Sequence, residues 1–204
     1  MSIPTAKIGN QIWMIANLAV KTFRNGDAIP FFENTGDFLK AGRHKEPACI
    51  FYDNNPEKGM LYNWFAINDS SRICPKGFSI PSESDWRELF DFCGGETIAA
   101  KHLKSTNGWV EPKNAPKPIE IVPSEIGNGL DTFNFNAKPM GALLKTQLIA
   151  EFFGFGSDAY FWASNTADFY SGWGRIAYMY YFSNRVMIDT TEKRLGMPVR
   201  CIKT

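Results

Sequence analysis

The stretch Pro81-Ser-Glu-Ser-Asp-Trp-Arg-Glu-Leu-Phe-Asp-Phe-Cys-Gly-Gly95 carries the clearest structural signal in the sequence. Ser82 is a preferred N-cap residue, and Asp85 stands three residues after it. Paired glycines at the far end of the stretch favour a helix C-terminus. We therefore predict a helix after Pro81, with one apolar stripe at the i, i+3, i+4 and i+7 positions formed by Trp86, Leu89, Phe90 and Cys93.

Weaker signals lie on both sides of this helix. A second, shorter helix is predicted over residues 96–104, with Leu103 on its inner face. Near the start, residues 8–20 contain two apolar runs with Gly9-Asn10 close to the first turn, which predicts a hairpin. Residues 26–46 are polar and interrupted, so we expect loops there. Residues 109–141 are rich in Pro, Gly and Asn, which predicts a long irregular segment.

Strand-like runs occupy both ends of the chain and flank the predicted helices. Two helices in the middle with strands at either end predict an α+β domain. The predicted strands cover residues 49–52, 59–67, 159–163, 175–182, 185–189 and 197–202.

Length and charge exclude several classes of function. The chain has 204 residues, so we expect a single domain over residues 1–204. Its 22 basic and 21 acidic side chains give a net charge of +1 without a basic run, and we therefore expect no nucleic-acid partner. No apolar stretch is long enough to cross a bilayer, so we expect no membrane insertion.

The first residues lack the basic region and the uninterrupted apolar run of a secretion signal. We expect the chain to be virion-associated or cytoplasmic as written, and extracellular if a signal has been trimmed. The four cysteines form no CxxC pair, and only His44 and His102 could join them. Disulfides or buried thiols are therefore favoured over a zinc site, and we expect no cofactor.

Six blocks of the sequence, in this order along the chain, resemble successive blocks of one known family: Ile8-Gly-Asn-Gln-Ile-Trp-Met-Ile-Ala-Asn-Leu18, Leu61-Tyr-Asn-Trp-Phe-Ala66, Cys74-Pro-Lys-Gly-Phe-Ser-Ile-Pro-Ser82 with Trp86 and Leu89, Leu103-Lys-Ser-Thr-Asn-Gly-Trp109, Phe161-Trp-Ala-Ser164 and Gly196-Met-Pro-Val-Arg-Cys201. On these blocks the chain is similar to the Fibrobacter succinogenes major paralogous domain family. That family looks like a branch of the C-type lectin-like fold, related to the formylglycine-generating enzyme group.

The resemblance carries expectations about fold and cysteines. It implies that the N- and C-terminal strands pair in one sheet, that two helices flank it, and that a second sheet carries long loops. It also implies that Cys74 and Cys201 lie close together. The rival pair is Cys93 with Cys201, because C-type lectins bridge the helix to the last strand.

No catalytic constellation is visible in the sequence. Neither histidine lies in a Ser or Cys motif, and no phosphate-binding glycine loop, HExxH or GxSxG pattern occurs. We expect that the chain is not an enzyme; the alternative is an enzyme related to the formylglycine-generating group. Calcium requires six to eight oxygen ligands. Asp131, Asn134 and Asn136 could supply some of them, but a loop without an ion is favoured over a calcium site.

Aromatic side chains are concentrated near the C-terminus. Residues 151–184 hold 13 of the 30 Phe, Trp and Tyr residues but only four charged residues. The resemblance implies that the last strands and their loops form a recognition face, and Tyr, Trp and Arg among small polar residues are typical of binding surfaces. The candidate ligand-binding residues are Tyr160, Asn165, Asp168, Phe169, Tyr170, Ser171, Trp173, Arg175, Tyr178, Tyr180, Asn184 and Arg185.

Other rings of the same region are assigned to the core, because Phe has no polar group that needs water. In a strand over residues 178–182, alternate side chains point to opposite faces. One of two sets must therefore be core: either Tyr178, Tyr180 and Phe182, or Met179 and Tyr181. The rings assigned to the core are Phe152, Phe153, Phe155, Phe161 and Trp162.

The sequence thus predicts a non-catalytic domain that binds a protein or glycan on a cell surface. The leading context is a phage receptor-binding protein, including the variable protein of a diversity-generating retroelement. A bacterial surface adhesin with its signal removed is one alternative, and a structural domain with a subunit interface is another. A homo-oligomer would suit a weak single-site binder, because linked sites gain avidity.

Overall fold

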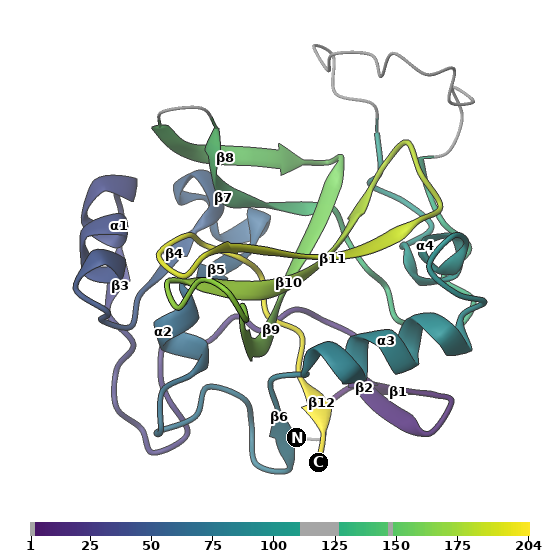
Figure 1. Cartoon of the computed structure of the whole chain (residues 1–204), viewed down its shortest axis with the longest axis horizontal. Helices are drawn as coiled ribbons and strands as arrows, with labels where there is room; N and C mark the ends of the chain where they lie inside the picture. The colour runs from purple at the N-terminus through teal and green to yellow at the C-terminus, as the bar shows by residue number, and fades with distance from the viewer. Residues whose placement is uncertain (1–2, 111–126, 147–148) are drawn as a thin grey trace.

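The computed structural model describes residues 3–110, 127–146 and 149–204, and within them it has the mixed α+β architecture predicted from the sequence (Figure 1). Its four α-helices are α1 (Thr35–Arg43), α2 (Trp64–Ile67), α3 (Glu83–Phe92) and α4 (Ala99–Leu103), and two short 3₁₀ turns follow β4 at Tyr52–Asn54 and Pro56–Lys58. No helix in the described ranges is long and apolar enough to cross a membrane.

Three sheets organise the strands. The first has the order β1-β2-β12-β6, the second β11-β10-β9-β7-β8, and the third β3-β4-β5. The strands are β1 (Thr5–Ile8), β2 (Gln11–Met14), β3 (Phe31–Phe32), β4 (Cys49–Phe51), β5 (Met60–Tyr62), β6 (Phe78–Ser79), β7 (Met140–Thr146), β8 (Ile149–Phe155), β9 (Asp158–Thr166), β10 (Trp173–Tyr180), β11 (Val186–Glu192) and β12 (Ile202–Lys203).

Helix α3 forms where the sequence predicted it. The Ser82 side chain accepts from the Asp85 backbone, and the Asp85 side chain accepts from the Ser82 backbone, which completes a capping box. Trp86, Leu89 and Phe90 are buried on its inner face. The Trp86 ring lies 4.8 Å from that of Trp13 on β2 and 5.3 Å from that of Phe161 on β9, so α3 fills the space between the first and second sheets.

The middle strand of the second sheet has cores on both of its faces. Ala159, Phe161 and Ala163 of β9 point into the cluster that contains α3. Tyr160 and Trp162 point into the other cluster, against β4 and β5. The Trp162 indole donates to the Tyr62 carbonyl at 2.7 Å, which ties the second sheet to the third.

Several expectations from the sequence are wrong in detail. Residues 26–46 are not only loop: Asn34 caps α1, and Phe38 and Leu39 bury its inner face. The predicted strand over residues 59–67 ends at Tyr62, because the Asn63 side chain caps α2. Strands β7 and β8 were not predicted, whereas the strand expected over residues 197–202 is reduced to β12.

The exposed phenylalanines of β8 are another correction. Phe161 and Trp162 are fully buried, as predicted, but Phe153 and Phe155 are exposed and Phe152 is half-buried. Their strand lies at the end of the second sheet, where it pairs only with β7. Exposed and half-buried side chains alternate along β8, so Phe153 and Phe155 lie on its solvent-facing side.

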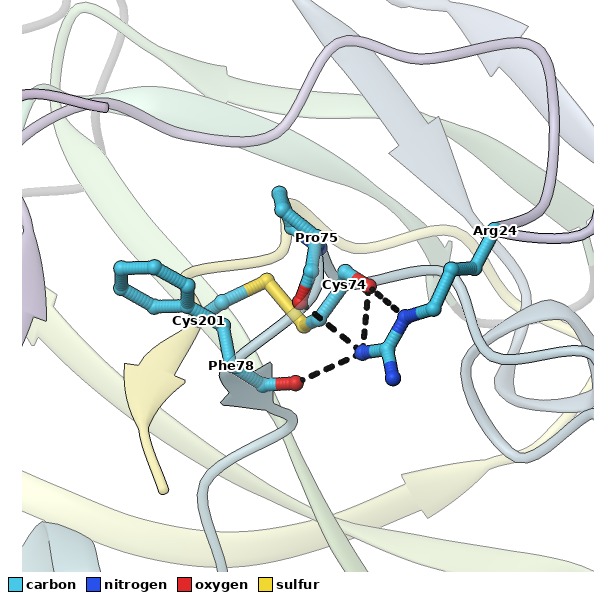
Figure 2. Close-up of a disulfide and its surroundings, with 5 residues drawn as sticks. All are labelled: Arg24, Cys74, Pro75, Phe78 and Cys201. Atoms are coloured by element: carbon cyan, nitrogen blue, oxygen red, sulfur yellow. Dashed lines mark hydrogen bonds between the residues drawn. A yellow bond between two sulfur atoms is a disulfide. The ribbon is translucent and has the colours of Figure 1, made fainter. Parts of the chain in front are cut away.

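The chain ends are joined through the first sheet and a disulfide. Cys201 precedes β12, which pairs with β2, and Cys201 is bonded to Cys74, 127 residues earlier. This is the pair implied by the family resemblance, and Cys93 is a free, buried thiol. The Arg24 guanidinium donates to the carbonyls of Cys74, Pro75 and Phe78 and so holds the loop on one side of the disulfide (Figure 2).

A buried arginine connects three distant segments. Arg200 is fully buried, and its guanidinium donates to the carbonyls of Met14, Phe135 and Asn136 and, through two N–H groups, to the Asn17 side chain. It also lies over the Phe135 ring, 4.6 Å from the ring centre. Burial lowers the pKa of this guanidinium, and the charge of Asp131 opposes that shift.

Removing the disulfide should destabilise the fold. Cys74→Ala with Cys201→Ala frees a loop of 127 residues in the unfolded chain, so we expect a loss of about 2–5 kcal/mol in the free energy of unfolding by urea. Reductant should cause a similar loss in the parent protein and none in the double variant. An equal effect of reductant on both proteins would contradict this role of the disulfide.

Arg200→Met should cost about 3 kcal/mol or more of unfolding free energy, because it leaves buried carbonyls without donors. Lys203→Met removes a charge from an exposed side chain two residues beyond Cys201, and it should change stability by less than about 0.5 kcal/mol. Urea unfolding monitored by tryptophan fluorescence measures both. Similar losses in the two variants would show that the charge, rather than the hydrogen bonds, is what matters.

Candidate functional site

The twelve candidate residues lie on one hairpin system, but they do not form one site. Strands β9 and β10 run antiparallel and are joined by residues 167–172 at one end, whereas residues 181–185 join β10 to β11 at the other (Figure 1). At 3.3 Å per residue, Trp173 and Tyr180 are about 23 Å apart along β10. The candidates therefore separate into a hairpin-tip group, a mid-sheet group and a far-turn group.

Alternation along β10 separates them further. One face of β10, which carries Gly174, Ile176 and Tyr178, packs against the core that contains Trp64. A Cβ added at Gly174 would lie 2.5 Å from the Trp64 ring. Ala177 and Met179 are core residues on the opposite face, next to α3. Trp173 and Arg175 belong to the α3 face, so they cannot contact the same small ligand as Tyr178 and Tyr180. Met179 is fully buried in the core next to α3, while Tyr178 and Tyr180 are half-buried and pack against the other core, so both alternatives left open by the sequence face a core.

The hairpin tip presents the most exposed rings of this region. Phe169 is 92% exposed, Tyr170 64% and Trp173 38%. The Tyr170 and Trp173 rings lie 5.9 Å apart, and the Trp173 backbone donates to the Tyr170 carbonyl, which closes a tight turn. The Asp168 carboxylate is exposed beside them. We call Asp168, Phe169, Tyr170 and Trp173 the tip surface.

Contacts with α3 hold the tip surface in place. The Asn165 side chain accepts from the backbone N–H of Glu83 at 2.6 Å. Arg175 lies between two carboxylates, 3.0 Å from Glu83 and 2.8 Å from Asp168. Asn165 and Arg175 were predicted to contact a ligand, but the Asn165 amide oxygen and the Nε and Nη2 groups of Arg175 bind other residues of the protein. Asn165 and Arg175 therefore help to fix the base of the hairpin that carries the tip surface.

Lys193 supports the same hairpin from the other side. Its ammonium donates to the Thr166 hydroxyl at 3.0 Å and to the Ser171 carbonyl at 2.8 Å. It also lies 3.9 Å from the centre of the Trp64 ring. Burial lowers the pKa of this lysine. Lys193 and Glu83 were not among the predicted site residues, because only the folded chain brings them to the hairpin. In the sequence, Glu83 is marked only as the residue after a helix cap.

The mid-sheet tyrosines form a ring cluster around a buried acid. Tyr160 is only 4% exposed, so its side chain belongs to the core rather than to an open binding surface. It stacks on Tyr178 with ring centres 5.8 Å apart, and Tyr180 packs against both rings. The Tyr160 hydroxyl donates to Asp158 at 3.4 Å. Burial raises the pKa of Asp158 to about 6, and Lys104 opposes this shift only in part.

Asn184 and Arg185 lie at the far turn. The Asn184 carbonyl accepts from the Ala100 backbone at 3.0 Å, and the Arg185 backbone donates to the Ser183 hydroxyl. The Lys104 ammonium, buried beneath, donates to the Ser183 carbonyl at 2.8 Å. These contacts attach the turn to α4, at the end of the sheet opposite to the tip surface.

The other chemical groups considered from the sequence are dispersed or occupied. Among the described residues, no three His, Cys, Asp or Glu side chains gather closely enough to hold a metal ion. The Asp131 carboxylate accepts from the Asn136 backbone at 2.7 Å, so it caps a turn. His102 lies 2.9 Å from the Thr132 hydroxyl, and His44 is exposed at the end of α1. Burial raises the pKa of the Cys49 and Cys93 thiols to about 12.

Comparison with known proteins gives one match. The family model described as the Fibrobacter succinogenes major domain matches residues 6–203. No curated protein and no solved structure matches the chain. The relation to C-type lectins and to formylglycine-generating enzymes therefore remains an expectation from the resemblance.

The buried Asp158 should make stability depend on pH. Its folded pKa of about 6 exceeds the unfolded value near 4, so the folded state binds more protons between these values, and stability falls as the pH rises through them. We expect a loss of about 2–3 kcal/mol between pH 4 and pH 7 from this group. Asp158→Asn should remove that part of the slope and be more stable at pH 7.

Urea unfolding at several pH values measures this effect. Asp189→Asn is the matched control, because Asp189 is exposed on the neighbouring β11 and should leave the slope unchanged. An unchanged slope in Asp158→Asn would mean that the Asp158 pKa is not raised.

Proposed function

This chain belongs to the Fibrobacter succinogenes major domain family, and on that premise we propose that it is a non-catalytic ligand-binding domain that contacts its partner through the tip surface. The observation that carries the proposal is the exposure of three large rings on a turn whose base is fixed by Lys193 and Arg175. An apolar ring held in water costs free energy that contact with a partner recovers. A turn that is already ordered loses little conformational entropy on binding.

The partner class we propose is a protein or glycan displayed on a cell surface. Trp and Tyr supply stiff, amphipathic contact area, and the neighbouring Asp168 and Ser171 supply polar groups for orientation. This composition suits both a sugar face stacked on a ring and an apolar anchor on a protein. The mid-sheet and far-turn residues are not part of the proposed site. Tyr160 is buried, Tyr178 and Tyr180 are half-buried on the other face of β10, and Asn184 and Arg185 lie at the opposite end of the sheet.

We propose an extracellular or virion setting and a C-type lectin-like arrangement for the domain. The Cys74–Cys201 disulfide supports the setting, because such bonds persist in oxidising environments. Pairing of the N-terminal β2 with the C-terminal β12 supports the arrangement, since the family resemblance implied it. A phage receptor-binding protein or a retroelement variable protein fits this proposal, and sequence variation confined to codons 168–173 among close relatives would support the latter.

An enzyme is the less favoured alternative. The described cysteines are either bonded to each other or buried with raised pKa values, so neither free thiol is an activated nucleophile. The two histidines lie apart, one on α4 and one at the end of α1. These observations favour binding over catalysis by a Cys–His mechanism.

Substitution of the tip rings should abolish binding without unfolding the domain. Oligomers of the parent protein and of the Phe169→Ser, Tyr170→Ser variant are applied to arrays of glycans and surface proteins. The variant should lose the binding signal that the parent protein gives. Its unfolding free energy should stay within about 1 kcal/mol of the parent, because both rings are exposed.

The matched control is Phe153→Ser, Phe155→Ser. It removes two exposed rings from β8 and should bind as the parent does. Equal loss in both variants would indicate non-specific adsorption through apolar surface. Full binding by the Phe169→Ser, Tyr170→Ser variant would refute the tip surface as the site.

A further inference from the structure

A small cavity lies away from the tip surface, between the segment that follows β2 and the segment that leads into β7. Its volume is about 190 Å³. Protein cavities of about 150 Å³ hold a benzene-sized molecule, so this one has room for a single ring or a short chain. Leu18, Met60, Met140 and Pro198 make its lining mainly apolar. Such a lining favours an apolar occupant.

The polar residues of the cavity are cationic or neutral. Lys138 lines it with an exposed side chain, and the neutral Asn17 and Asn136 lie beside it. Arg200 forms part of the buried wall. No acidic residue is among the lining residues of this cavity.

The charge of Arg200 is only partly balanced. All five of its N–H groups donate to carbonyl or amide oxygens, which are uncharged. In residues 3–110, 127–146 and 149–204, no carboxylate lies within 4.0 Å of Arg200 or of the Lys138 ammonium. Asp131 interacts with Arg200 from farther away. The positive charges of Arg200 and Lys138 outnumber the one negative charge of Asp131, so the electrostatic potential in the cavity is positive. The cavity wall has a low dielectric constant and screens this potential poorly.

We propose that this cavity binds a small carboxylate that carries an apolar ring or a chain of about six carbons. The apolar part lies against Leu18, Met60 and Met140, and the carboxylate lies beside Lys138. Because the N–H groups of Arg200 are all occupied, Arg200 contributes its charge and not a hydrogen bond. This ligand site is independent of the tip surface and of the function proposed for it.

The test compares three probes of similar size on the full chain: benzoate, benzyl alcohol and benzylammonium. Binding is followed by NMR shifts of the Met60 and Met140 methyl groups. We expect benzoate to bind with a dissociation constant on the order of 1 mM, as suits so few atoms. Benzyl alcohol should bind about threefold more weakly, because it lacks the charge, and benzylammonium should bind most weakly.

Two variants locate the binding. Ala19→Trp places a ring at an exposed position of the cavity lining and should abolish the benzoate shifts without a change in melting temperature. Lys138→Gln should remove the preference for benzoate over benzyl alcohol. Lys40→Gln, which removes an exposed charge from α1, should preserve it.

Several results would overturn the proposal. The first is that benzoate causes no shift of the methionine methyl signals. The second is that benzoate and benzyl alcohol bind the parent protein with equal affinity. The third is that the benzoate shifts persist in Ala19→Trp. If Ala19→Trp lowers the melting temperature, Ala16→Trp replaces it, because Ala16 is also an exposed lining residue.

Discussion

The buried guanidinium of Arg200 is the interaction on which the arrangement of the chain depends. A charge in the interior is tolerated only when its donors are satisfied, and here the acceptors come from the β2 end, the 135–136 turn and the Asn17 side chain. Residues 14–17 and 135–136 are far apart in sequence from each other and from Arg200, so the guanidinium is satisfied only when both segments are in place. The disulfide at the neighbouring Cys201 restricts the same region covalently. Together they fix the last residues against the first sheet, and Arg200 also forms part of the cavity wall.

The central strand β9 connects the two cores of the fold. Its alternate side chains enter two cores, so neither core forms without it. Phe161 and Trp86 meet on one face, while the Trp162 indole bonds to the Tyr62 carbonyl on the other. At its C-terminal end β9 leaves the core and becomes the base of the tip surface. The buried part of β9 therefore ends just before the turn that carries the exposed rings.

The strongest local signal in the sequence was predicted correctly, whereas several elements that depend on tertiary contacts were missed. Helix α3 was predictable because its capping box and apolar stripe lie within a few residues of each other. Helix α1 was missed, since its buried Phe38 and Leu39 stand among polar residues and Gly42 packs against Arg194 from a distant segment. The exposure of Phe153 depends on which face of β8 packs against the rest of the fold, and no local pattern reveals that face. For the same reason the sequence identified the aromatic region but not its division between two faces and two ends.

The way the tip surface is held has a consequence for how its sequence could change. Lys193 binds a backbone carbonyl at Ser171, and the supporting side chains Asn165 and Glu83 lie outside the turn. A backbone carbonyl is present whatever the side chain of that residue. Phe169 and Tyr170 bury little area in the folded protein, so their replacement costs little stability. Asp168 is the exception, because it pairs with Arg175, but Glu83 also pairs with that arginine. The fold can therefore keep one supporting frame while the rings that meet a partner differ.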